Sequence, residues 1–178
     1  MRYNNKPLIC MRLVGHHHVP ANKNLKNYPY RVELFHLLKS EVECEVYMIG
    51  DNIYYPSVHA YDKSQPVVNA PVYGDVIIDN MSYADMVRYI QECATWVAID
   101  SFWHHASALQ QKRGVAILGP WKKENVGYPW NINIEMPSEY QIPHCRYIDT
   151  ELARPAELFP TPRQVVDAVK SILEERNV

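Results

Sequence analysis

The chain contains the stretch Trp96-Val-Ala-Ile-Asp-Ser-Phe-Trp-His-His-Ala-Ser-Ala-Leu109. Its first four residues are apolar, which is typical of a short buried strand. Asp100 ends this run, and the residues from about Ser101 to Gln111 predict a helix. A buried strand that ends on an acidic residue and leads into a helix is typical of the edge at which a parallel α/β sheet binds ligands.

Short apolar runs and helix-length segments alternate on both sides of this stretch. Helices are expected after Pro29, after Ser82 and from Thr161, where residues that favour helix starts occur. This alternation predicts an α/β fold: a single Rossmann-like domain over residues 1–178, with a mainly parallel sheet, helices on both faces and a C-terminal helix at 160–177. The expected strands are residues 8–14, 45–49, 75–78, 96–99, 115–118 and 131–134.

Composition narrows the classes of function. The 178 residues carry 18 Lys and Arg against 20 Asp and Glu, without a basic run, so we expect no nucleic-acid partner. No apolar run approaches the roughly 20 residues of a membrane span. The amino-terminal residues resemble no cleavable signal and the four cysteines are widely spaced, so we expect a cytoplasmic protein with free thiols.

The six glycines do not form either of the usual phosphate-binding loops. A helix N-terminus after a strand offers another device, because its unpaired amides and its dipole attract a phosphate group. Asp100 and the helix that begins near Ser101 fit this description, and His105 could add a donor. The competing interpretation is that Asp100 only caps the helix while His104 and His105 pack against neighbours. The residues alone leave both open.

The chain resembles the C-terminal domain of glycosyltransferase family 9, which includes the ADP-heptose:lipopolysaccharide heptosyltransferases. The family signature is a strand ending in Asp, then Thr/Ser-Gly-x-x-His-x-Ala-Ala, a Gly-x-Pro turn, a strand and Gly-Pro. Here it reads Asp100-Ser-Phe-Trp-His-His-Ala-Ser-Ala108, and later Gly114 and Val115-Ala-Ile-Leu-Gly-Pro120. The family's K-x-W-P motif corresponds to Lys26-Asn-Tyr-Pro29, and Gly127-Tyr-Pro129 continues the match. The resemblance covers residues 6–175.

The resemblance implies one half of a GT-B fold and a nucleotide-sugar site at the strand ends. It implies Lys26 as a phosphate cation, Asp100 on the sugar, Ser101 and the amides through His105 as phosphate donors, and Asp51 near the ribose or base. Without the resemblance, Lys26 would be interpreted as a solvated loop residue. The expected ligand-binding set is Lys26, Asp51, Asp100, Ser101, Phe102, His104, His105 and Gly119.

Two departures from the family affect this expectation. Phe102 replaces a glycine that lets the backbone approach the phosphates closely. The family has two Rossmann-like domains, and this chain matches only the second. The acceptor surface and the catalytic base belong to the first, so we expect no catalytic residue here and no activity of the chain alone.

We expect no cofactor and no metal ion. The alternative is a zinc site, since His16, His17 and His18 follow the first strand and would face the same crevice as His104 and His105. His144 and Cys145 could join it. Neither H-x-x-x-H nor C-x-x-C occurs, and the family does not need a metal ion to stabilise its leaving group. Without a metal ion, we expect these side chains to line the crevice as polar groups or to pack within loops.

The sequence is compatible with three functions. The first is binding of a nucleoside-diphosphate sugar, with ADP favoured, in a transferase completed by a separate N-terminal domain. The second is a non-catalytic nucleotide-binding protein that senses or sequesters a nucleotide or a nucleotide-derived signal, with a possible homo-oligomer replacing the lost domain contact. The third is an interaction module without ligand binding.

Overall fold

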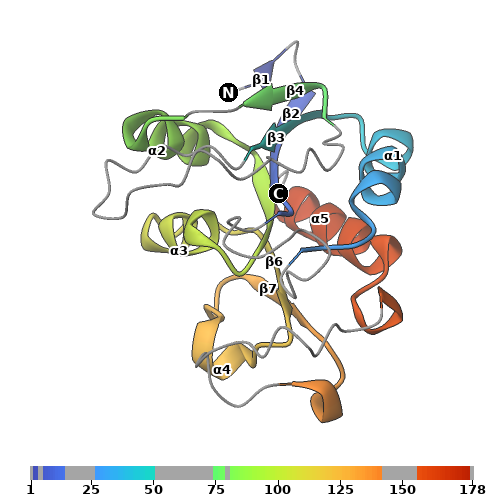
Figure 1. Cartoon of the computed structure of the whole chain (residues 1–178). Helices are drawn as coiled ribbons and strands as arrows, with labels where there is room; N and C mark the ends of the chain where they lie inside the picture. Colours follow the sequence, from blue (N-terminus) through green and yellow to red (C-terminus); the bar gives the residue numbers. More distant parts are fainter. Residues whose placement is uncertain are drawn as a thin grey trace, which may run out of the picture.

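The structure is a computed structural model that describes residues 2–3, 6–14, 27–50, 74–78, 81–141 and 156–176. Figure 1 shows its strands surrounded by helices from distant parts of the chain. Lys26, Asp51, the run His16 to His18, His144 and Cys145 lie outside the described residues. The expectations on these residues therefore stay predictions.

Six strands form one parallel sheet in the order β4-β3-β2-β5-β6-β7. A seventh strand, β1 (Arg2–Tyr3), pairs antiparallel with β2. The order places β2 and β5 side by side, with Ile9 opposite Thr95 and Arg12 opposite Ala98. This is the Rossmann order, in which the chain changes direction across the sheet between its two central strands. The bounds are β2 (Lys6–Arg12), β3 (Glu45–Ile49), β4 (Val76–Ile78), β5 (Thr95–Ile99), β6 (Val115–Gly119) and β7 (Ile132–Glu135).

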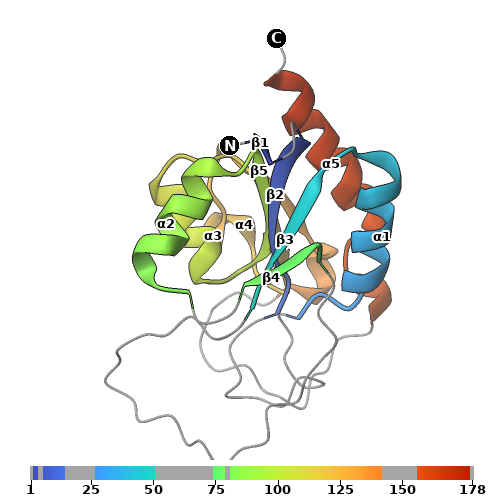
Figure 2. The ribbon, with the colours of Figure 1, turned by 90° about the horizontal axis from the view of Figure 1, so that it is seen from above.

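The helices cover both faces of the sheet. Figure 2 shows α2 (Tyr83–Glu92) and α3 (Phe102–Leu109) on one side, and α1 (Arg31–Glu41) and α5 (Pro162–Glu175) on the other. Alternate strand residues enter the two cores, as a pleated strand requires. On β2, for example, Ile9 and Met11 pack on the side of α1 and α5. Cys10 packs on the side of α2 and α3.

Polar side chains at the starts of α2 and α5 act as the sequence predicts, whereas Pro29 lies one residue before the N-cap of α1, Tyr30. The Ser82 hydroxyl accepts a hydrogen bond from the Asp85 amide at 3.1 Å at the start of α2. Thr161 and Gln164 form a capping box at the start of α5. These bonds satisfy amides that the first helical turn leaves unpaired.

The α/β fold with a mainly parallel sheet and helices on both faces is confirmed. All six expected strands are present with bounds shifted by at most two residues, and α5 lies within the expected 160–177. Two short elements were not expected: β1 and the single-turn helix α4 (Lys123–Val126). Two 3-10 turns span Ser138–Tyr140 and Ala156–Leu158.

Three of the cysteines, Cys10, Cys44 and Cys93, are buried free thiols. Burial is the largest cause that raises the pKa of Cys10 well above its usual value. Burial also raises the pKa of Cys44, to about 11. Both thiols therefore stay protonated near neutral pH, which makes them weak nucleophiles.

Candidate functional site

The candidate site begins where β5 ends. Asp100 follows Ile99 directly and is 6% exposed. Because β2 and β5 are parallel neighbours, their carboxyl ends meet at the same edge of the sheet. The sheet order reverses between β2 and β5. Open α/β sheets bind ligands at the carboxyl ends of the strands beside such a reversal.

Ser101 is the N-cap residue of α3, with extended backbone angles (φ −155°, ψ 169°). Its side chain makes no capping hydrogen bond. Within the described part of the chain, its buried Oγ has no hydrogen-bond partner. A buried hydroxyl without a partner costs free energy, and a hydrogen bond to a ligand would offset that cost.

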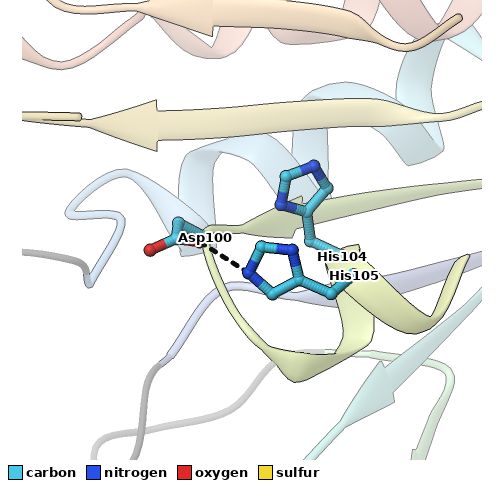
Figure 3. Close-up of side chains that lie close together, drawn as sticks. All are labelled: Asp100, His104 and His105. Carbon is cyan, nitrogen blue, oxygen red and sulfur yellow. Dashed lines mark ion pairs between the residues drawn. The ribbon is translucent and has the colours of Figure 1, made fainter. Parts of the chain in front are cut away.

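His105 connects Asp100 to the loop after α4. Its Nε2 lies 3.2 Å from Oδ1 of Asp100. Its Nδ1 lies 3.0 Å from the hydroxyl of Tyr128. Figure 3 shows the imidazole extending from the first turn of α3 toward the Asp100 carboxylate. The His105 side chain is 41% exposed, so one part of this pair remains accessible from solvent.

His104 has a different environment from its neighbour. It is 0% exposed. The ring centroids of Trp96 and Tyr128 lie 5.7 Å and 5.2 Å from its own. Burial, followed by the proximity of His105, lowers the pKa of His104 to about 4, while the Asp100 carboxylate acts in the opposite direction. The imidazole is therefore neutral near neutral pH.

Phe102 and Gly119 complete the described part of the expected set. Phe102 is the first residue of α3, is 37% exposed, and contacts the Tyr83 ring at 6.0 Å between centroids. Gly119 ends β6 with φ 57°, a left-handed conformation that glycine adopts without strain. Asp100, His104 and His105 lie together, since an oxygen of Asp100 and a nitrogen of each imidazole are within 4.8 Å of one another.

Arg12 is a residue that the sequence analysis missed. It is 2% exposed at the carboxyl end of β2. Its guanidinium donates a hydrogen bond to the carbonyl of Gly50, just after β3. The sequence offers one signal for it: Arg12 is a charged residue inside an otherwise apolar run from Leu8 to Val14, where a buried charge needs a partner. The bond holds the chain at the residue before Asp51.

A surface depression of about 980 Å³ lies at the opposite edge of the sheet. Pro7 and Ala94 line it where β2 and β5 begin, together with side chains of both charges such as Glu43 and Lys112. Its mixed lining favours no particular ligand, and it does not include Asp100. We therefore place the candidate site at the carboxyl edge. Among the described residues, no helix is long and apolar enough to cross a membrane.

The fold and the strand-end site define the class of a Rossmann-like domain that resembles one half of a GT-B glycosyltransferase. No protein-family model matches the sequence, and no curated protein does. Solved structures do match. ADP-heptose LPS heptosyltransferase II of E. coli has a TM-score of 0.64 at 18% identity, over 99% of this chain and 49% of that one.

Two further solved structures are similar to this chain in fold. A glycosyl transferase family 9 protein from Veillonella parvula has a TM-score of 0.61 at 16% identity. The match covers 97% of this chain and 47% of the Veillonella parvula chain. The E. coli heptosyltransferase WaaC, with ADP-2-deoxy-2-fluoro heptose, has a TM-score of 0.52 at 13% identity. The match covers 98% of this chain and 45% of the WaaC chain. The chain thus has a glycosyltransferase-like fold and spans about half the length of these proteins.

Proposed function

We propose that this chain binds a nucleoside-diphosphate sugar, with an ADP-sugar favoured, at the sheet edge between the ends of β2 and β5. The diphosphate would lie at the N-terminus of α3. Sugar transfer would require an acceptor surface and a base from a second domain, supplied by a separate chain or by a longer parent. The resemblance to glycosyltransferase family 9 and the WaaC structure with a nucleotide-sugar analogue support this choice of ligand.

The observation that carries the proposal is the buried hydroxyl of Ser101 at the N-cap of α3. It makes no capping bond and has no partner among the described residues. A phosphate oxygen would accept a hydrogen bond from it and from the first amides of the helix. The positive end of the helix dipole favours the same anion.

The neighbouring residues suggest how the remaining groups would be recognised. Asp100 would accept hydrogen bonds from hydroxyls of the sugar, and His105 would donate to a phosphate oxygen. Tyr28 donates its amide to the carbonyl of Leu13 at 3.0 Å, which anchors the chain two residues after Lys26 beside the end of β2. This anchoring supports Lys26 as a cation for the diphosphate. Asp51 remains a proposed contact to the ribose or base.

In the proposed reaction, the acceptor hydroxyl attacks the anomeric carbon while the bond from that carbon to the diphosphate oxygen breaks. The acceptor proton passes to the base of the second domain. Lys26, Ser101 and the α3 amides would stabilise the charge that develops on the departing nucleoside diphosphate. This chain would supply the leaving-group half of the reaction.

A second candidate is a protein that binds a nucleotide without transferring a sugar. Phe102 favours it, because a partly exposed phenyl ring stands at the first position of α3, where the family pattern has glycine. A side chain at this position limits how closely a donor can approach the helix amides. Assays of donor hydrolysis and transfer separate the two candidates.

The test is calorimetric titration of the full chain with ADP, UDP, GDP and their sugars, with a chelator present. We expect Ser101→Ala to weaken binding roughly 10- to 100-fold, the effect of losing a hydrogen bond to a charged group. Lys26→Ala and Asp100→Ala should also weaken it. The matched control is Ser82→Ala, since Ser82 is the N-cap of α2 and its hydroxyl is already bonded.

The outcomes are distinct. Absence of binding by any of these nucleotides would leave only the interaction module. Unchanged affinity in Ser101→Ala and Asp100→Ala would place the ligand elsewhere. Sugar transfer by the chain alone would contradict the requirement for a second domain.

A further inference from the structure

Three metal-ligating side chains converge at the start of α3. One carboxylate oxygen of Asp100 and one ring nitrogen each of His104 and His105 lie within 4.8 Å of one another. Asp100 ends β5, and the histidines belong to the first turn and a half of the helix that follows (Figure 3). The strand end and the helix start thus place the three donors on one side of the same turn.

His104 provides an independent indication of a ligand. It is 0% exposed. Neither of its ring nitrogens has a hydrogen-bond partner in the part of the chain that the structure describes. A buried polar group without a partner costs free energy, and a metal ion would remove that cost for the one nitrogen whose lone pair it accepts. Burial also keeps this imidazole neutral, the form that binds metal ions.

The contacts of His105 match those of a ligating histidine. Its Nδ1 lies 3.0 Å from the Tyr128 hydroxyl, which orients the ring and directs Nε2 toward Asp100. Histidine ligands usually hold their second nitrogen in such a hydrogen bond. Nε2 and Oδ1 of Asp100 are 3.2 Å apart. Two donors bound tetrahedrally at about 2.0–2.1 Å from zinc would lie about 3.4 Å apart, so this spacing fits a shared ion.

We propose that Asp100, His104 and His105 bind a divalent transition-metal ion of the zinc class. Two imidazoles favour such an ion over magnesium or calcium, which prefer oxygen ligands. Three protein ligands leave a position for water or an anionic ligand, as in zinc sites with an exchangeable ligand. The inference goes beyond the proposed function, because the ion needs no nucleotide in order to bind.

The inference departs from the sequence-based expectation of no metal ion. Two adjacent histidines do not form a known ligand spacing, and an aspartate before a helix is usually a cap. Only the structure shows that Asp100 and His104 approach each other across the turn, and that His104 is buried without a hydrogen bond.

The experiment uses full-length protein freed of metal by a chelator and then dialysed. Co²⁺ is titrated while its visible d–d bands are followed, and Zn²⁺ is then added to displace it. Because His16, His17 and His18 could bind these ions themselves, the titrations are made in a variant carrying His16→Gln, His17→Gln and His18→Gln. We expect one Co²⁺ per chain, displaced by Zn²⁺ and not by Mg²⁺.

Two variants test the ligand set. His104→Phe keeps a ring against Trp96 and Tyr128 while removing both nitrogens, and Asp100→Asn removes the carboxylate charge. Each should weaken Co²⁺ binding by more than the roughly 10- to 100-fold that loss of an outer hydrogen bond costs. Tyr128→Phe should fall within that range. His36→Phe on α1 is the matched control and should leave Co²⁺ affinity unchanged. Circular dichroism confirms that each variant is folded.

Retention of Co²⁺ affinity in both His104→Phe and Asp100→Asn would overturn the proposal. Loss of binding upon replacement of the His16 to His18 run would overturn it as well. The nucleotide titrations contain a chelator and depend on Ser101→Ala, whereas the metal titrations contain no nucleotide and depend on His104→Phe. Failure of one proposal is therefore distinguishable from failure of the other.

Discussion

Gly114 lies directly against the indole ring of Trp96: a Cβ placed on this glycine would be 2.2 Å from two ring carbons. Trp96 is fully buried, and its Nε1 donates to the carbonyl of Lys112 at 2.8 Å, so the ring is held on two sides. The same ring contacts His104. The start of β6 therefore sets the position of the ring that supports the candidate site.

The first prediction concerns this contact. Gly114→Ala should destabilise the protein by about 3 kcal/mol, the upper part of the usual range for overpacking a core, because neither the backbone nor the buried ring can move freely. Urea unfolding measures the loss. The double variant Gly114→Ala with Trp96→Phe should lose less than the sum of the two single variants. Additive losses would show that the two residues are not in contact.

The second prediction contrasts the N-cap serines of α2 and α3. Ser82→Ala removes a capping bond to the Asp85 amide and should cost about 1 kcal/mol. Ser101→Ala removes a hydroxyl that makes no capping bond, so it should cost much less. Thermal unfolding without ligand compares the two variants. An equal or larger loss in Ser101→Ala would mean that this hydroxyl serves the fold.

The third prediction concerns Tyr28, within the segment that resembles the family's K-x-W-P motif. Its hydroxyl donates to the carbonyl of Pro160 at 2.8 Å, and this buried bond connects the approach to α1 with the approach to α5. Tyr28→Phe leaves that carbonyl unpaired and should cost roughly 1–3 kcal/mol in urea unfolding.

Tyr30→Phe is the control, because the Tyr30 hydroxyl makes no hydrogen bond within the described part of the chain. Its stability should stay close to that of the unmodified protein. If both variants unfold at the same urea concentration, the bond to Pro160 contributes nothing measurable.

The fourth prediction concerns the pH dependence of stability. Glu41 at the end of α1 accepts hydrogen bonds from Arg163 at 2.6 Å and Lys170 at 2.5 Å, both on α5. The Arg163 bond, followed by the Lys170 bond, lowers the pKa of Glu41 from 4.5 to about 2. A carboxyl with a lowered folded-state pKa stabilises the fold above its unfolded-state pKa, and this stabilisation is lost as the pH falls.

The unmodified protein should therefore lose more stability than Glu41→Gln as the pH falls from about 4.5 to about 2. Urea midpoints collected across this interval compare the two slopes. Parallel slopes would show that Glu41 has the same proton affinity in the folded and unfolded chains. Glu174→Gln, a change at the far end of α5, serves as the control for a general charge effect.

Much of the fold was predictable because its elements carry local signals. Apolar runs mark the strands, and Ser82 and Thr161 mark helix starts through bonds to residues three positions away. The elements that escaped prediction lack such signals. β1 has two residues and α4 has four, too few to show a periodic pattern, and they depend on their neighbours.

The site was predictable only where its residues are adjacent in sequence. Asp100, Ser101 and His105 occur within one short stretch, and Nε2 of His105 lies 3.2 Å from Oδ1 of Asp100. Their binding of a ligand stays a prediction. The contact of His105 with Tyr128 spans 23 positions. The bond from Arg12 to Gly50 spans 38. Neither follows from a local pattern. The roles of Lys26 and Asp51 stay predictions.

The position of α5 has a consequence for how the chain acquires its structure during synthesis. Four residues of α5 form part of the core on the side of α1: Val165, Val166, Val169 and Ile172. They share this core with residues of β2, β3, β5 and β6, all of which are synthesised before α5. A nascent chain that ends before residue 172 has only α1 to cover that face of its sheet, so the part that packs against α5 stays exposed. The exposed surface would be a binding site for chaperones until α5 leaves the ribosome.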